Sequence, residues 1–190
     1  MDTERNGEFL EIIKSKLTPA RLYHSICVAE QAEKLAKIFG ENSKKAYTAG
    51  LVHDIMKYAS PEEMIDLIQS DGVSLSESEK KATKILHAPA GEVYLRKKLG
   101  VTDKDILSAV KYHTTGKENM TLFEKIIFVA DLTSAERQYP DVEEMRHLAE
   151  TDIDKALLKG LAFTIEKNAR KNRPIHLDTV KAFNYLAERI

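Results

Sequence analysis

The chain has 190 residues, enough for one core, and its 43% apolar and 31% charged residues are typical of a folded globular protein. Its 29 Lys and Arg nearly balance its 30 Asp and Glu, so no overall charge favours nucleic acid or anionic membrane as a partner. The single Cys27 excludes an internal disulfide, and because no apolar signal segment or run of about 20 apolar residues occurs, we expect a cytoplasmic protein.

Helix-start signals recur along the chain. Thr18-Pro19 and Ser60-Pro61 each pair an N-cap residue with proline at the first helical position. Ser76 and Thr121 each precede a glutamate by three residues, as in a capping box. No run of alternating β-branched residues indicates a strand. The sequence therefore predicts an all-α protein of about eight to ten helices.

The C-terminal part shows a minor boundary near Pro140-Asp141, after which residues able to bind metal become fewer. Its pattern predicts one long helix, about Asp152 to Lys171, and then a closing helix. We interpret residues 1–190 as a single domain with a core over about 18–138. The helices over 141–190 would pack on this core and could cover the site.

Polar side chains interrupt the apolar helical segments. His53-Asp54 directly follows the apolar run Ala49 to Val52, and burying an imidazole and a carboxylate without partners is costly. His24 shares a helical stripe with apolar residues, so it should point inward. Asp131 lies in an apolar helix that offers no obvious reason to bury a carboxylate. A metal ion or a hydrogen-bond network could satisfy these groups.

Two further histidines extend this set. His113 falls near a helix end, and His87 precedes Ala88-Pro89, where a helix is expected to break or begin. Any one of these residues could be an ordinary, partly buried side chain with a hydrogen-bonding partner. Four of the six histidines together with two aspartates favour a metal site instead. Mixed imidazole and carboxylate ligands suit manganese, iron or zinc better than calcium, and the residue types alone do not identify the metal.

The order of these residues, a histidine, then His-Asp and then a distant helical aspartate, resembles the HD superfamily of metal-dependent phosphohydrolases. Longer segments look like the bacterial YqeK family, namely Ala49 to Lys57, His87 to Gly91, Tyr112 to Lys117, Ala130-Asp131 with Arg137, and Glu144-Met145-Arg146. The resemblance covers roughly Leu22 to Leu158. It implies a helical HD-domain bundle that hydrolyses diadenosine tetraphosphate symmetrically, to two ADP.

The resemblance also implies a metal and roles for individual residues. The metal would be iron, as one or two ions, with manganese or zinc as alternatives, and its ligands would be His24, His53, Asp54 and Asp131. A second metal position or the bound phosphates would be lined by His87 and His113. The nucleotide would be approached by Lys57, Tyr58, Ala59, Ser60, His87, His113, Thr114, Arg137 and, in a weaker match, Arg173 and His176. The family also suggests a homodimer.

A mechanism follows from these residue types. A metal can activate water for attack on an inner phosphorus, and the two oxygens of Asp54 could bridge two ions. Together with Asp54, the expected catalytic groups are Lys57, His87 and His113. Lys57 and Arg137 would offset developing negative charge, although Lys57 could instead pair with Asp54 and Arg137 could lie on the surface.

One departure from the family and several alternatives remain. After Asp131 the family usually has Glu-Pro, but here Ser134-Ala135 stand in its place, which leaves open whether a carboxylate acts there.

Another HD nucleotidase, acting on deoxynucleotides or a guanosine alarmone, is the nearest alternative function. Cyclic-dinucleotide phosphodiesterases fit less well because no Gly-Tyr-Pro follows His113. A non-enzymatic nucleotide-binding module and a helical interaction protein are the other candidates.

Overall fold

The computed structural model describes residues 1–190, apart from the side chain of Ser78. After a short 3-10 helix, η1 (Asp2–Arg5), the described chain contains eleven α-helices and no strand. In chain order these are α1 (Asn6–Lys16), α2 (Pro19–Phe39), α3 (Ser43–Val52), α4 (Pro61–Gln69), α5 (Glu77–Lys81), α6 (Thr83–Lys98), α7 (Lys104–Tyr112), α8 (Leu122–Thr133), α9 (Val142–Thr151), α10 (Ile153–Arg170) and α11 (Leu177–Ala187). The prediction of an all-α protein is thus confirmed.

The helix count over the described residues is one above the upper estimate, because several helices begin without the signals used to predict them. At the start of α1 the N-cap residue is Arg5, and no side chain bonds the first turn. The same is true of α6, which follows Ala82, and of α9, which follows Asp141. Tertiary packing, rather than local capping, determines where these helices form.

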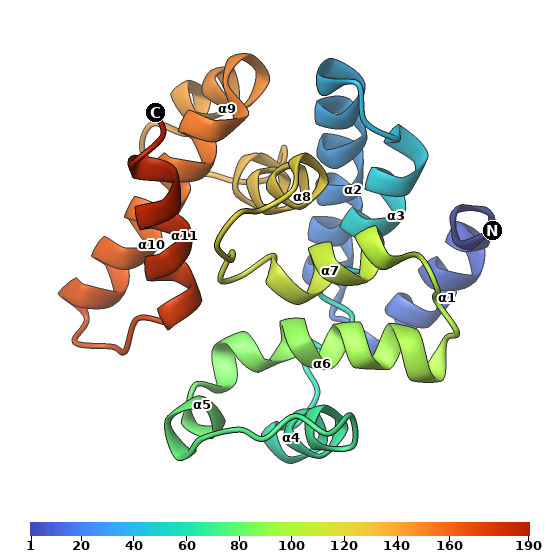
Figure 1. Cartoon of the computed structure of the whole chain (residues 1–190). Helices are drawn as coiled ribbons and strands as arrows, with labels where there is room; N and C mark the ends of the chain where they lie inside the picture. Colours follow the sequence, from blue (N-terminus) through green and yellow to red (C-terminus); the bar gives the residue numbers. More distant parts are fainter.

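Helix α8 lies at the centre of the molecule, between α2 and α3 on one side and α9 and α10 on the other (Figure 1). In the middle of this helix Ile126, Ile127, Val129 and Ala130 are apolar and inaccessible to solvent. A helix that is apolar on all sides is expected to be surrounded by other helices. Helices α4, α5 and α6 form a separate edge of the molecule (Figure 1), and α7 lies between that edge and α8.

Small residues allow α2 and α3 to pack closely. A Cβ added to Gly50 would lie 2.7 Å from the Cα of Ala29, closer than real Cβ atoms approach any backbone atom. Gly50 is therefore required by this contact and not by backbone conformation. The close packing carries the C-terminal end of α3, where His53 lies, onto the face of α2 that bears His24.

Helix α6 corrects one expectation. The chain neither breaks nor begins a helix at Pro89, because α6 runs continuously from Thr83 to Lys98 with the proline inside it. Proline removes one backbone donor, which the packing of α6 against α4 and α7 offsets. His87 consequently lies on a continuous helix rather than at a helix end.

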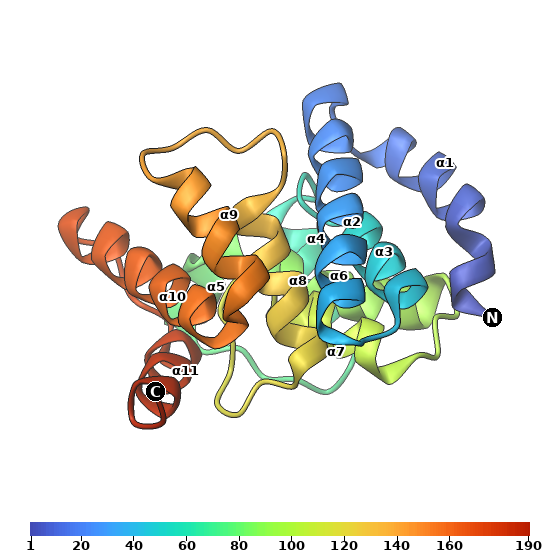
Figure 2. The ribbon, with the colours of Figure 1, turned by 90° about the horizontal axis from the view of Figure 1, so that it is seen from above.

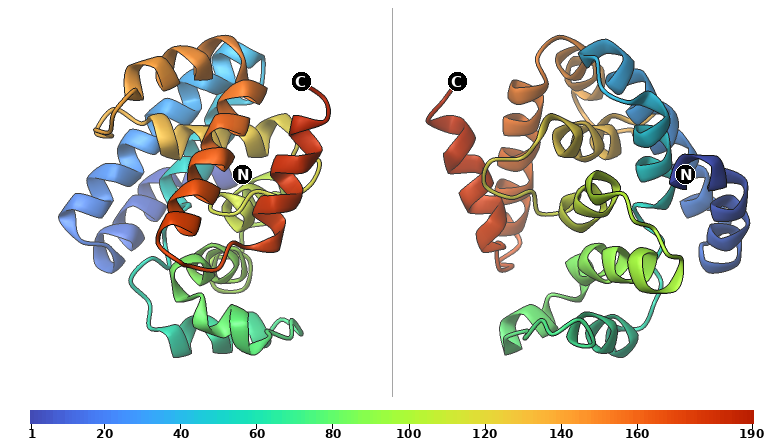
Figure 3. Two further views of the ribbon diagram at one scale, coloured as in Figure 1. Left: turned by 90° about the vertical axis from the view of Figure 1, so that its left-hand side faces the viewer. Right: turned by 45° about the vertical axis from the view of Figure 1, so that its right-hand side comes forward.

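The C-terminal helices α10 and α11 pack on each other, and α10 also packs on α8 and α9. The bounds of α10 agree closely with the long helix predicted from the sequence. Seen from above, α10 and α11 lie on the opposite side of α8 from α1 (Figure 2), and the right-hand view in Figure 3 also separates the two chain ends. No helix in the described part of the chain has the length and apolar character needed to cross a membrane.

Candidate metal centre

Six side chains predicted from the sequence as ligands come together from five parts of the fold. They are His24 on α2, His53 and Asp54 after α3, His87 on α6, His113 after α7 and Asp131 on α8. The four histidines are at most 5% exposed and Asp54 is 1% exposed. Asp131 is partly accessible, with 21% of its side chain exposed, so the cluster has one open side.

Three of the histidines are oriented in the same local way. Each places Nδ1 near the carbonyl oxygen three residues earlier, at 2.6 Å for His53, 2.9 Å for His87 and 2.7 Å for His113. A carbonyl oxygen accepts hydrogen bonds and cannot donate them, so Nδ1 carries the proton in each ring. The lone pair on each Nε2 is therefore directed into the cluster and is free to bind a metal.

The fourth histidine, His24, is oriented by a carboxylate. Its Nδ1 lies 2.5 Å from Oε1 of Glu136, and the hydroxyl of Ser134 donates to the same oxygen at 2.9 Å. Carboxylates commonly hold the outer nitrogen of metal-binding histidines in this way. Glu136 was not predicted from the sequence, because the family pattern places a carboxylate at the position of Ser134. The loop does supply a carboxylate, but two residues later than the family pattern places it.

Asp54 lies between two pairs of histidines. Its Oδ2 is 3.4 Å from Nε2 of His53 and 3.8 Å from Nε2 of His24. Its Oδ1 is 2.9 Å from Nε2 of His87 and 3.5 Å from Nε2 of His113. One carboxylate thus faces both halves of the cluster, as a ligand bridging two ions would.

Unpartnered atoms indicate that the cluster suits a cation. Nε2 of His24, Nε2 of His53 and Oδ1 of Asp54 are buried and lack a hydrogen-bond partner among the described residues. Nε2 of His24 also lies 3.1 Å from Oδ1 of Asp131, without the geometry of a hydrogen bond. Buried polar atoms are rarely left in this state, and a metal between these lone pairs would satisfy them.

The second half of the cluster also directs nitrogen lone pairs toward a common point, although Nε2 of His87 is contacted by Lys57 as well. Nε2 of His87 and Nε2 of His113 lie 3.2 Å apart, and because both rings carry their proton on Nδ1, two lone pairs face each other. Potential ligand atoms within 4.8 Å of one another form two overlapping groups, His24 with His53 and Asp131, and His53 with Asp54 and His113. The nitrogen and oxygen donors fit manganese, iron or zinc, as the sequence predicts.

The protonation states support this interpretation. Burial lowers the pKa of His87 to about 4, so the ring is neutral at neutral pH. Burial by itself would raise the pKa of Asp54, but the neighbouring histidines, His53 above all, hold it well below its usual value. The pKa of Asp131 is also far below its usual value, because His24, His53 and Arg137 outweigh the effect of burial. The carboxylates are thus ionised and the His87 ring is neutral, the forms that ligate metals.

Two cationic side chains contact Asp54. Nη1 of Arg21 lies 2.9 Å from its Oδ2, and Nζ of Lys57 lies 3.3 Å from its Oδ1 and 3.1 Å from Nε2 of His87. Arg21 was not predicted, although it lies three residues before His24 and therefore on the same face of α2.

A third cation, Arg137, contacts Asp131. It donates to Oδ1 of Asp131 and, through Nε, to the Asp131 carbonyl oxygen at 2.7 Å. Arg146 on α9 holds the loop that carries Glu136 and Arg137. Its guanidinium donates to the carbonyl oxygens of Thr133, Ser134, Ala135 and Arg137. The family resemblance included Arg146 without assigning it a role. In the structure Arg146 holds this loop in place through these hydrogen bonds, and we call it the clamp of the loop.

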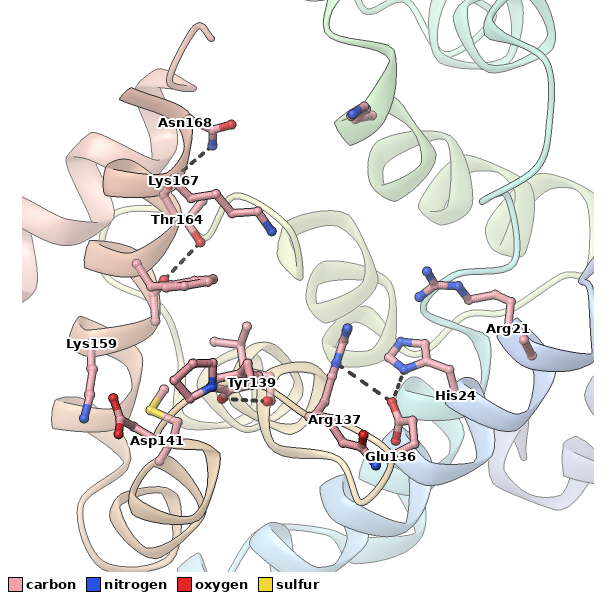
Figure 4. Close-up of a pocket in the computed structure, with 18 of the residues that line it drawn as sticks. Arg21, His24, Glu136, Arg137, Tyr139, Asp141, Lys159, Thr164, Lys167 and Asn168 are labelled. Atoms are coloured by element: carbon pink, nitrogen blue, oxygen red, sulfur yellow. Dashed lines mark hydrogen bonds and ion pairs between the residues drawn. The ribbon is translucent and has the colours of Figure 1, made fainter. Parts of the chain in front are cut away.

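A cleft of about 1060 Å³ opens beside the cluster (Figure 4). Arg21 and His24 lie on one side of it, Glu136 and Arg137 on the loop at its base, and α10 forms the opposite side. We call this space the α10 cleft. Its volume lies at the upper end of the range of roughly 300–1000 Å³ usual for small-molecule sites.

The structure places the residues predicted to contact substrate in several different locations. Tyr58, Arg137 and Arg173 line the α10 cleft, whereas Thr114 and His176 line a different cavity of about 150 Å³. The other five line neither cavity: Lys57, His87 and His113 lie at the metal-centre cluster, and Ala59 and Ser60 lie further away along the chain. Ala59 lies in the turn before α4, and the Ser60 hydroxyl caps that helix by accepting a hydrogen bond from the Glu63 amide.

Comparisons with known proteins agree with this arrangement. The profile of the HD domain family matches residues 21–136. The chain is 41% identical over 180 residues to a Halalkalibacterium halodurans protein named "Bis(5′-nucleosyl)-tetraphosphatase, symmetrical", covering 95% of this chain and 96% of the relative. A Bacillus subtilis protein of the same name is 38% identical over 179 residues, covering 94% and 96% of the two chains.

A crystal structure from Clostridium acetobutylicum is also similar, with a TM-score of 0.94 and 36% identity over 97% of both chains. That protein is described as a predicted HD superfamily hydrolase involved in NAD metabolism. The matches span the helices that carry all six ligand candidates. The chain therefore belongs to the HD domain family and, within it, to the group of proteins named symmetrical bis(5′-nucleosyl)-tetraphosphatases.

Proposed function

We propose that this protein hydrolyses diadenosine tetraphosphate, and related dinucleoside tetraphosphates, symmetrically to two ADP. The observation that carries the proposal is the 41% identity, over 95% of the chain, to a relative named for this activity. The geometry supports it, because a buried cluster of histidines and carboxylates lies beside a cleft large enough for an extended nucleotide.

The proposed metal is iron, as one or two ions, with manganese and zinc also suited to the donors present. His24, His53, Asp54 and Asp131 would hold the first ion, and His87, His113 and Oδ1 of Asp54 would face the second. When bound, such a metal supplies Lewis-acid chemistry, since it lowers the pKa of water and offsets charge on phosphate oxygens.

The reaction forms one P–O bond from water to an inner phosphorus and breaks the central P–O–P anhydride, so that both products are ADP. Asp54 orients both halves of the centre through its two oxygens. Lys57, beside Asp54 and His87, is placed to contact a phosphate oxygen, and Arg137 to do so beside Asp131. Preorganised cations of this kind stabilise the loose transition states of phosphoryl transfer.

The remaining contacts to substrate are also proposals. Tyr58 and Arg173 would contact the part of the substrate in the α10 cleft, and Thr114 and His176 the part nearer the smaller cavity. Ala59 and Ser60 would approach the nucleotide through the exposed turn before α4.

Location and assembly complete the proposal. The single Cys27 is buried and unpaired, which suits the reducing conditions of the cytoplasm. A homodimer is proposed from the family resemblance alone, and light scattering of the purified protein at several concentrations tests it directly.

A substrate panel tests the proposed function. The purified, metal-analysed protein is incubated with diadenosine tetraphosphate, a deoxynucleoside triphosphate and a guanosine tetraphosphate alarmone, and hydrolysis rates are compared. We expect the dinucleotide to give the highest kcat/KM. Preferential turnover of either other substrate would contradict the proposal, and tight binding of the dinucleotide without turnover would favour a binding module.

A further inference from the structure

Phe163 is a large apolar side chain left open to solvent inside the α10 cleft. It lines that cleft and is 49% exposed, although α10 buries five other residues against the core. Gly160, Thr164 and Lys167 also line the cleft, at the helical spacing that places them on one face with Phe163. This face of α10 is directed toward the metal centre across the cleft (Figure 4).

Tyr139 supports the Phe163 ring. The two ring centroids are 6.2 Å apart, with 23° between the ring planes, so the rings are nearly parallel. The Tyr139 hydroxyl donates to the carbonyl oxygen of Leu132 at 2.9 Å, which fixes this ring to the end of α8. The ammonium of Lys167 lies 5.5 Å from the Phe163 ring centroid. The result is a supported aromatic surface with a cation beside it.

The charges around the α10 cleft favour an anionic chain. Six cationic residues line it, against the two acidic residues Glu136 and Asp141. Glu136 is already engaged by His24. Three of the cations, Lys84, Lys167 and Arg173, form no ion pair with any described side chain. They lie on different elements around the cleft and are free to contact phosphate.

The shape of the proposed substrate requires a second nucleoside site. A dinucleoside tetraphosphate cleaved at its central anhydride has one nucleoside on each side of the metal centre. Thr114 and His176, among the contacts predicted for a nucleotide, line the smaller cavity and not the α10 cleft. The α10 wall, with Phe163 and Lys167, is not among those predicted contacts, yet it shares one continuous cleft with His24.

We propose that Phe163, backed by Tyr139, stacks on the base of the second purine nucleoside, with Lys167 contacting the adjoining phosphate. This subsite rests on the proposed function and extends it by naming where the second half of the substrate binds. Stacking on an aromatic side chain needs no hydrogen-bond pattern, so it accepts any purine. It contributes to ground-state and transition-state binding alike, and its loss should therefore raise KM while leaving kcat nearly unchanged.

The first test compares Phe163→Ala with the wild type on diadenosine tetraphosphate. We expect KM to rise about tenfold with little change in kcat. The inhibition constant of inorganic tetraphosphate, which has no base, should stay the same. Ile38→Ala is the matched control, because Ile38 is also exposed, at 44%, but lies at the far end of α2 and does not line the cleft.

The second test uses the absence of tryptophan from the sequence. Phe163→Trp retains an aromatic surface, so it should keep a near-wild-type KM, and it introduces a single tryptophan whose fluorescence can be excited apart from that of the seven tyrosines. A methylene-bridged, non-hydrolysable diadenosine tetraphosphate analogue should quench this fluorescence, whereas inorganic tetraphosphate should not. In Ile38→Trp neither ligand should change the signal.

The outcomes separate the subsite from the function. If the wild type cleaves diadenosine tetraphosphate but Phe163→Ala has an unchanged KM, or the analogue binds Phe163→Trp without quenching, the subsite is wrong and the proposed function stands. If the wild type neither cleaves the dinucleotide nor binds the analogue, both are wrong.

Discussion

Replacing Glu136 tests whether this carboxylate orients a metal ligand. Its Oε1 accepts hydrogen bonds from His24 Nδ1 at 2.5 Å and from the Ser134 hydroxyl at 2.9 Å. In Glu136→Ala the outer nitrogen of His24 loses this acceptor, so the ring no longer has a fixed orientation toward Asp131. Removing such an outer partner typically lowers metal affinity about 10- to 100-fold.

The expected change corresponds to roughly 1.4 to 2.7 kcal/mol of metal-binding free energy. Glu136→Gln keeps an oxygen that can accept from His24 but loses the charge, so we expect an intermediate affinity. Metal affinity is measured by competition with a chromophoric chelator, and helicity by circular dichroism. The predicted order of affinity is wild type, then Glu136→Gln, then Glu136→Ala, with helicity unchanged.

A matched control separates orientation from surface charge. Glu33 is also on the helix that carries His24, where it pairs with Lys37 at 2.8 Å outside the site, so Glu33→Gln should bind metal as the wild type does. If Glu136→Ala binds metal within about twofold of the wild type, the carboxylate does not act through His24 and the reasoning fails.

Three further substitutions test other parts of the account. Gly50→Ala should lower the melting temperature by about 2 to 10 °C in differential scanning calorimetry, because its Cβ would overlap Ala29, whereas Gly7→Ala, with no atom within 4 Å, should not lower it. Asp54→Asn should lose bound metal in elemental analysis and lower kcat at least about 100-fold, and full metal content with full activity would refute a bridging role. Arg146→Ala should make the loop over Thr133 to Arg137 easier to cleave in limited proteolysis, because four carbonyl contacts are lost, and an unchanged cleavage pattern would show that the clamp is dispensable.

Much of the site could be predicted because its residues are polar where the surrounding helical pattern is apolar. His24, His53 and Asp131 are polar residues in apolar helical segments, and the structure brings them together. The all-α fold and the bounds of α10 were predicted because apolar periodicity persists over long segments. Pro89 was misinterpreted because local propensity does not include the packing that keeps α6 continuous.

Other parts could not be predicted because they depend on contacts between distant segments. Glu136 meets His24 across 112 positions in the sequence, and nothing local to the loop indicates that partner. Arg146 acts by closing a loop whose backbone shape the sequence does not specify. Phe163 in the sequence is an ordinary apolar residue of an amphipathic helix, and its exposure in the cleft is visible only in the fold.

The most direct test of the central claim is the identity of the products formed from diadenosine tetraphosphate in water labelled with heavy oxygen. The account predicts ADP as the sole nucleotide product, two per substrate, with the label in the terminal phosphate of half the ADP. Formation of ATP and AMP would show that an outer anhydride bond, and not the central one, is broken, and would contradict the account.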